Sequence, residues 1–198
     1  MSKTSGKAKK AAKAVAKADR DATHDAASRR DTTPMKVAGM LGEIADQPQL
    51  IALSAATIAA GLIGGRRDLV RGGARMLAAH LLATAAKTAI KHRFDRLRPG
   101  KALDEGHTRF ERGDSDDHQL NSFPSGHTAG VVAVARTAAR EIDGAAVPAA
   151  LGAGAVAAIQ PAAGNHYLSD VIVGGAIGWI AEAMVDAMME RIPLIREE

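Results

Sequence analysis

Residues 122–135 read SFPSGHTAGVVAVA, and this stretch decides how the rest of the chain is interpreted. Proline, serine and glycine precede an apolar run, which predicts a helix start with Ser125 near its N-cap. Because backbone N–H groups are unpaired at such a start, the turn favours an anion. Gly126 leaves room for an anion oxygen, and His127 titrates near neutral pH. The alternative is a plain helix cap with a surface histidine.

A cationic stretch, KHRFDRLRP at residues 91–99, lies before this turn. Lys91 and Arg98 are seven residues apart, close to two helical turns, so both can face one point. Pro99 favours an extended Arg98 and ends the helix near there. The stretch supplies two cations for an anion, unless it is an ordinary cationic cap at a helix end.

A third polar stretch, NHYLSD at residues 165–170, precedes the last apolar segment. His166 and Asp170 are four residues apart, within one turn of each other if a helix begins here. A carboxylate that accepts from one imidazole nitrogen leaves the other nitrogen as a nucleophile. Alternatively, Ser169 or Asp170 caps the final helix.

Apolar segments surround the three stretches, and strand signals are weak. Residues 48–65 and 144–165 carry no formal charge and are each about long enough to cross a bilayer core. Segments 69–90, 127–140 and 171–190 are mainly apolar but interrupted by charges. We therefore expect an all-α, membrane-embedded helical bundle of about five to six helices, with the polar stretches at one end. Residues 35–46 would add a short amphipathic helix at an interface.

Small residues dominate the apolar segments. Gly61 and Gly65, like Gly174 and Gly178, have the four-residue spacing of helices that approach closely in a bilayer. The same composition would also suit a tightly packed soluble bundle. Cysteine is absent, which excludes disulfides and thiolate metal sites.

The first 34 residues form a basic segment, and we take residues 35–198 as the helical domain. Residues 1–36 hold ten Lys/Arg against four Asp, whereas the rest of the chain holds 16 Lys/Arg against 18 Asp/Glu. With few large apolar residues, segment 1–34 predicts a disordered or transiently helical tail. A solvated tail and contact with anionic lipid headgroups are the competing interpretations. Nucleic acid is not expected as a partner, because no aromatic residue lies among the lysines.

The ordered set of stretches resembles the signature of the phosphatidic acid phosphatase type 2 / haloperoxidase superfamily: K-x6-R-P, then P-S-G-H, then S-R-x5-H-x3-D. Residues 91–99 and 124–127 match in full, and His166 with Asp170 matches the last part. The resemblance implies that His166 attacks phosphorus, that Asp170 orients His166, and that His127 protonates the leaving oxygen.

The same resemblance implies how the phosphate is held. Lys91 and Arg98 would bind phosphate oxygens, with hydrogen bonds from Ser125 and the backbone of Gly126. No metal and no cofactor are implied, because cations and positioning supply the stabilisation of the transition state.

The sequence departs from the signature where the family has Ser-Arg, since this chain has Ile159-Gln160. Gln160 can donate hydrogen bonds to a phosphate, but it carries no charge and lacks the arginine fork. The loss of one cation from the phosphate site would lower the rate of hydrolysis roughly 10²–10³-fold. Arg93, Arg96 and Arg136 are the candidates to compensate for it.

We expect a phosphatase of lipid phosphate or isoprenyl (pyro)phosphate monoesters, working through a phosphohistidine in a multi-pass protein of the bacterial inner membrane. Its partners would be the substrate and membrane lipids, and no oligomeric state follows from the sequence. The alternatives are a degenerate member that binds phosphate headgroups with little turnover, and a soluble acid phosphatase or haloperoxidase of the same superfamily. The basic tail and the loop 91–124 share one side of the membrane in a four-span arrangement of the apolar segments, and one extra span at residues 35–46 would reverse this.

Overall fold

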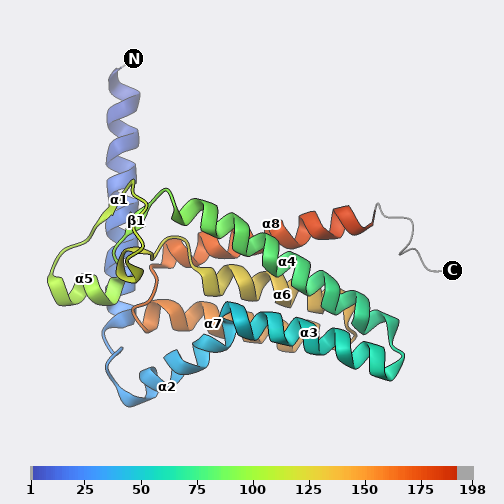
Figure 1. Cartoon of the computed structure of the whole chain (residues 1–198). Helices are drawn as coiled ribbons and strands as arrows, with labels where there is room; N and C mark the ends of the chain where they lie inside the picture. The colour runs from blue at the N-terminus through green and yellow to red at the C-terminus, as the bar shows by residue number, and fades with distance from the viewer. Residues whose placement is uncertain (1, 191–198) are drawn as a thin grey trace.

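The computed structural model describes residues 2–190, which form eight α-helices and a few short elements (Figure 1). The α-helices are α1 (Ser2–Ala27), α2 (Thr33–Gly42), α3 (Gln47–Gly64), α4 (Arg67–Lys91), α5 (Pro99–Glu105), α6 (Gly126–Glu141), α7 (Ala146–Ala162) and α8 (Leu168–Met189). The short elements are the 3₁₀ turns η1 (Glu43–Ala45) and η2 (His118–Leu120) and the antiparallel strands β1 (Asp95–Arg96) and β2 (Phe110–Glu111). The all-α class is confirmed. The number of helices is higher than expected, because α1 and the short α5 are helical as well.

Five long helices build the bundle, and each corresponds to one of the apolar segments expected from the sequence. Helix α6 lies at the centre, in contact with α3, α4, α7 and α8 (Figure 1). Helices α1, α2 and α5 gather at one end of this bundle. That end also holds the loop between α4 and α6, so the polar stretches meet there.

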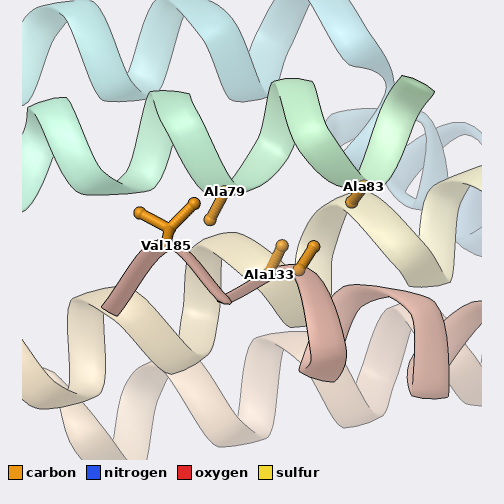
Figure 2. Close-up of a cluster of buried hydrophobic side chains, with 5 residues drawn as sticks. Ala79, Ala83, Ala133 and Val185 are labelled. Carbon is orange, nitrogen blue, oxygen red and sulfur yellow. The ribbon is translucent and has the colours of Figure 1, made fainter. Parts of the chain in front are cut away.

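Small side chains bring α4, α6 and α8 close together. Figure 2 shows Ala79 and Ala83 of α4 beside Ala133 of α6 and Val185 of α8, all of them buried. An alanine core keeps the helix axes near one another and leaves little space for larger side chains. The short distance between α6 and α8 fixes the start of α6 relative to the start of α8.

Glycines complete the contact between α6 and α8. A Cβ atom on Gly174 would lie 2.4 Å from the carbonyl oxygen of Ser125, and one on Gly178 would lie 2.3 Å from that of Ala129. The close approach expected for this glycine pair is therefore present. Gly65, in contrast, ends α3 in the left-handed conformation with φ of 66°, which favours glycine.

The outer surface of the bundle is rich in apolar side chains. Within residues 2–190, α3 and α8 are the two helices that are long and apolar enough to cross a membrane. Only 17% and 28% of their most apolar windows are buried in the protein, whereas a core helix of a soluble protein buries most of such a window. Leu62, Ile63 and Ile172 are examples of the exposed apolar residues. Helices α3 and α8 are therefore candidate membrane spans.

An ion-pair network joins α4, α6 and α8 away from the loop-rich end. Arg75 pairs with Glu141 and lies 3.2 Å from Asp186, and Arg136 lies 2.9 Å from Glu182. Arg136 is ten residues from the start of α6, roughly 15 Å along the helix. It is therefore committed to Glu182 and does not replace the missing cation at position 160.

Helix α1 runs across the end of the bundle and contacts the start of α8 (Figure 1). Asp19 Oδ1 accepts a hydrogen bond from the backbone N–H of Ser169 at 2.9 Å, and the buried Thr23 Oγ1 accepts one from Leu168 N–H at 3.2 Å. Helix α1 thus caps the N-terminus of α8. Most of the segment for which we expected a disordered or transiently helical tail is therefore the helix α1 in the structure, because composition does not reveal a capping contact made 150 residues away.

Candidate active site

A cavity of about 290 Å³ lies at the loop-rich end of the bundle. Its lining includes five of the eight site residues expected from the sequence, namely Lys91, Arg98, Gly126, His127 and His166. They come from the end of α4, the loop that follows it, the start of α6 and the loop before α8. The three polar stretches therefore form one site.

His166 has a defined tautomer in this site. Its ring is buried, and its centroid lies 5.9 Å from that of His127. Its Nδ1 lies 2.7 Å from the carbonyl oxygen of Ser122. Since a carbonyl only accepts hydrogen bonds, Nδ1 carries the proton and Nε2 of the neutral ring keeps its lone pair. Burial lowers the pKa of His166 from 6.5 to about 4, so the ring is neutral at pH 7.

Asp170 organises the loop around His166 instead of accepting a hydrogen bond from it. Its Oδ2 is 3.8 Å from His166 Nδ1, beyond hydrogen-bond distance. The carboxylate accepts from Ser122 Oγ at 2.6 Å, from Arg96 Nη1 at 2.5 Å and from Tyr167 N–H at 2.9 Å. The direct orientation expected from the family pattern is thus replaced by an indirect one, in which Asp170 holds Ser122 and the Ser122 carbonyl holds the imidazole.

Backbone carbonyl groups position the two expected cations. Lys91 donates to the carbonyl of Asn121, while Arg98 donates to those of His118 at 3.0 Å and Asn165 at 3.2 Å. Helix α4 ends at Lys91, so Arg98 does not lie on the same helix as expected from their spacing. Instead, the loop after α4 folds back and brings Arg98 to the cavity. The Arg98 charge, followed by burial, lowers the pKa of His118. His118 is therefore a neutral neighbour of the arginine at pH 7.

The turn at the start of α6 adopts the geometry expected from SFPSGH. Ser125 is the N-cap, and its Oγ accepts from Thr128 N–H at 3.3 Å. Ser125 is fully buried and does not line the cavity, whereas Gly126 does. The turn thus offers backbone N–H groups at a helix start, and the Ser125 hydroxyl has a capping role in place of the expected phosphate contact.

Gln160 does not line the cavity. Its side chain is buried, accepts from Asn165 Nδ2 at 3.4 Å, and packs against Gly42, where a Cβ atom would lie 3.3 Å from Nε2. Its carbonyl accepts from the backbone N–H groups of Asn165 and His166 at 3.0 and 3.3 Å. Gln160 therefore supports the loop that carries His166.

Lys87 lines the cavity, although the sequence interpretation did not include it. Neither Arg93 nor Arg96 lines the cavity, and Arg96 is committed to Asp19 and Asp170. The spacing could have identified Lys87, because a residue four positions before Lys91 lies on the same helical face.

Asp46 is a second unexpected member of the site. It lies at the N-cap of α3, and its Oδ1 is 2.7 Å from Nε2 of His127. Burial lowers the pKa of His127, and the Asp46 carboxylate, which stabilises the protonated ring, opposes this shift. No group of three carboxylates or imidazoles suited to a metal ion occurs within residues 2–190.

Residues 72–192 match the family model of the PAP2 superfamily. The chain belongs to this superfamily. The PAP2 match contains all eight site residues expected from the sequence, while α1, α2, α3 and Asp46 lie outside it.

Solved PAP2-type structures share the fold. A transmembrane PAP2-type phosphatidylglycerolphosphate phosphatase from Bacillus subtilis is 20% identical, with a TM-score of 0.62 over 92% of this chain and 90% of that one. LpxE of Aquifex aeolicus is 18% identical, with a TM-score of 0.62 over 84% of this chain and 93% of that one. At such identities the likeness concerns the fold alone. No curated protein sequence matches the chain.

Proposed function

We propose that the protein is a metal-independent phosphatase that hydrolyses a lipid phosphate or isoprenyl (pyro)phosphate monoester through a phosphohistidine on His166. The observation that carries this proposal is the pair of imidazoles, 5.9 Å apart, at a cavity lined by Lys91 and Arg98. A nucleophile, a proton donor and anion-binding cations are the minimum set for phosphoryl transfer to a side chain.

In the first half-reaction, Nε2 of His166 attacks phosphorus in line with the ester oxygen. The P–N bond forms as the P–O bond to the leaving group breaks. The leaving oxygen takes a proton from His127, whose protonated form Asp46 stabilises. Lys91, Arg98 and the backbone N–H groups at the start of α6 neutralise the charge on the remaining phosphate oxygens.

In the second half-reaction, water attacks the phosphoryl group and the P–N bond breaks. His127, now neutral, takes a proton from this water, which restores its protonated form. Inorganic phosphate leaves, and His166 regains its unprotonated Nε2. The Ser122 carbonyl holds the proton of His166 on Nδ1 in both half-reactions.

The fold supports a lipid substrate. With α3 and α8 as spans, the hydrophobic tail of the substrate stays in the bilayer while its phosphate reaches the cavity at the end of the bundle. Both structural neighbours are bacterial, and one is described as a transmembrane phosphatidylglycerolphosphate phosphatase. We therefore propose a multi-pass protein of the bacterial inner membrane. The exposed apolar faces of α3 and α8 disfavour a soluble acid phosphatase or haloperoxidase.

The test is release of inorganic phosphate by the detergent-purified protein from phosphatidic acid, phosphatidylglycerolphosphate and a prenyl diphosphate. We expect turnover of at least one of them, loss of turnover in His166→Ala, and an acid-labile phosphoryl group on the wild-type chain after a rapid quench. Background release from the whole panel would reject the proposal.

A second candidate function is phosphate-headgroup binding with little turnover, which the uncharged Gln160 favours. Binding of a lipid phosphate to the wild-type protein without release of phosphate, and without a phosphorylated intermediate, would support it over the phosphatase.

A further inference from the structure

The cavity holds a third cation, supplied by Lys87. Lys87 and Lys91 are one turn apart on α4, so both side chains project toward the same space. Among residues 2–190, three basic side chains therefore line the cavity against one carboxylate, Asp46. A cavity with this excess of positive charge is complementary to an anion with more than one negative charge.

The ammonium of Lys87 has no committed partner. Among residues 2–190 no carboxylate lies within ion-pair distance of Lys87 Nζ, and its side chain makes no hydrogen bond that would occupy it. Lys91 and Arg98, in contrast, both donate to backbone carbonyls. A half-buried ammonium without a partner is costly unless an anion or water neutralises it, so this position is prepared for a ligand.

Lys87 also lies beside the anion-binding turn. Its Nζ is 3.0 Å, and its Cδ 3.3 Å, from the place where a Cβ atom on Gly126 would be. Since Gly126 opens α6, the ammonium and the free N–H groups of that helix start border the same part of the cavity. The absence of a side chain at position 126 is what allows this approach.

We propose that Lys87 is a phosphate-binding residue of this site and supplies the positive charge that the chain lacks at position 160. The proposal deepens the proposed phosphatase function and rests on it. Lys87 binds phosphate oxygens together with Lys91, Arg98 and the start of α6. The pocket thus keeps three cations although Gln160 is uncharged and lies outside the cavity lining.

The experiment measures phosphate binding without turnover. Lys87→Gln and Lys101→Gln are made in the full-length His166→Ala protein in detergent, and the Kd for inorganic phosphate is measured by calorimetry. Lys101 is the matched control, because it lies at the same end of the protein but pairs with Glu105 outside the cavity. We expect Lys87→Gln to weaken phosphate binding about 10- to 100-fold and Lys101→Gln to leave it unchanged.

The same substitutions in the catalytically intact chain separate the two proposals. With Lys87→Gln we expect the inhibition constant of phosphate to rise by a similar factor, while the melting temperature stays within the range of the Lys101→Gln protein. Unchanged phosphate binding in a folded Lys87→Gln protein would overturn this inference and leave the phosphatase proposal intact. Phosphate binding that depends on Lys87, in a wild-type protein without turnover, would uphold the inference and reject the phosphatase. If Lys87→Gln fails to fold, Lys87→Met preserves the packing of the stem and is measured in the same way.

Discussion

Asp19 of α1 and Arg96 of the loop after α4 form a buried ion pair, with 2.8 Å between Oδ2 and Nη2. The other terminal nitrogen of Arg96 lies 2.5 Å from Asp170. Arg96 therefore joins the N-terminal helix to the carboxylate that holds Ser122, and Ser122 in turn orients His166. The N-terminal helix thus supports the active site through four consecutive polar contacts.

The first prediction concerns this ion pair. Asp19→Ala leaves Arg96 with one carboxylate in place of two and removes a cap from α8. We expect the free energy of unfolding to fall by about 2–4 kcal/mol, since both a buried pair and a cap are lost. Thermal unfolding in detergent measures it. Asp21→Ala is the control, because Asp21 pairs with Lys17 and Arg20 at the surface, and its melting temperature should match the wild type. Equal melting temperatures for both variants would contradict a supporting role for α1.

The second prediction concerns the protonation of His166. Burial lowers its pKa to about 4, and the nucleophile must be unprotonated, so activity is lost as the pH falls through about 4 and not through 6.5. Histidine titration by NMR on nitrogen-15-labelled protein gives the pKa directly, with the His166→Gln protein identifying the resonance. A pKa near 6.5 for His166 would show that the ring is solvated, and would argue against the buried orientation on which the mechanism depends.

The third prediction separates the general acid from the nucleophile. His127→Gln removes the proton donor while His166 remains. The loss of rate therefore depends on how strongly departure of the leaving oxygen requires its protonation. In the first turnover, before water attacks the phosphohistidine, we expect release of the alcohol from phosphatidic acid to slow roughly 10²–10⁴-fold. First-turnover release of p-nitrophenol from p-nitrophenyl phosphate, whose leaving group departs without a proton, should slow much less. His107→Gln, at a position outside the cavity lining, should change neither rate. Equal losses on both substrates would assign His127 to binding and not to proton transfer.

The fourth prediction concerns the departure from the family pattern. In Gln160→Arg, the larger side chain meets Gly42 and loses the bond to Asn165. Because the phosphate charge is already supplied by Lys87, we expect no gain in turnover and a loss of stability of about 1–3 kcal/mol from overpacking. Initial rates and thermal unfolding check both parts. A tenfold or larger gain in rate would show that the cavity lacks a cation, and would count against the role of Lys87.

The sequence was sufficient for the fold class and for the convergence of the polar stretches. Apolar segments of helical length give the five bundle helices, and the proline, serine and glycine before His127 give the start of α6. The spacing of residues along the sequence did not predict the contacts where the chain leaves a helix. Lys91 and Arg98 meet through a folded loop and not through two helical turns. Asp170 is four residues from His166, yet it bonds to Ser122, because the carboxylate turns to cap the first turn of α8.

Contacts between segments far apart in the chain leave no pattern in the nearby sequence from which they could be predicted. Asp46 reaches His127 only because α3 begins beside the start of α6, and Asp19 reaches Arg96 only because α1 lies across the bundle end. Neither carboxylate stands in a recognisable pattern. Lys87 is different, since its helical spacing from Lys91 was visible in the sequence. What the sequence did not show is that position 160 turns away from the cavity, which gives Lys87 its importance.

The last prediction links the glycine packing of α8 to the chemistry of α6. A methyl group on Gly174 would meet the carbonyl oxygen of Ser125 at 2.4 Å, a distance that forces α6 and α8 apart. Because Ser125 caps α6 and Gly126 lines the cavity, the displacement moves the anion-binding turn relative to His166, whose loop leads into α8. In Gly174→Ala we expect the free energy of unfolding to fall by about 1–3 kcal/mol and turnover to fall roughly 10- to 100-fold from misplacement of the reacting groups. The matched control is Gly175→Ala, where the added methyl group meets Thr128 at an ordinary 3.8 Å and both quantities should stay near the wild type. Equal effects at positions 174 and 175 would mean that helix propensity, and not the contact with the turn, governs this part of α8.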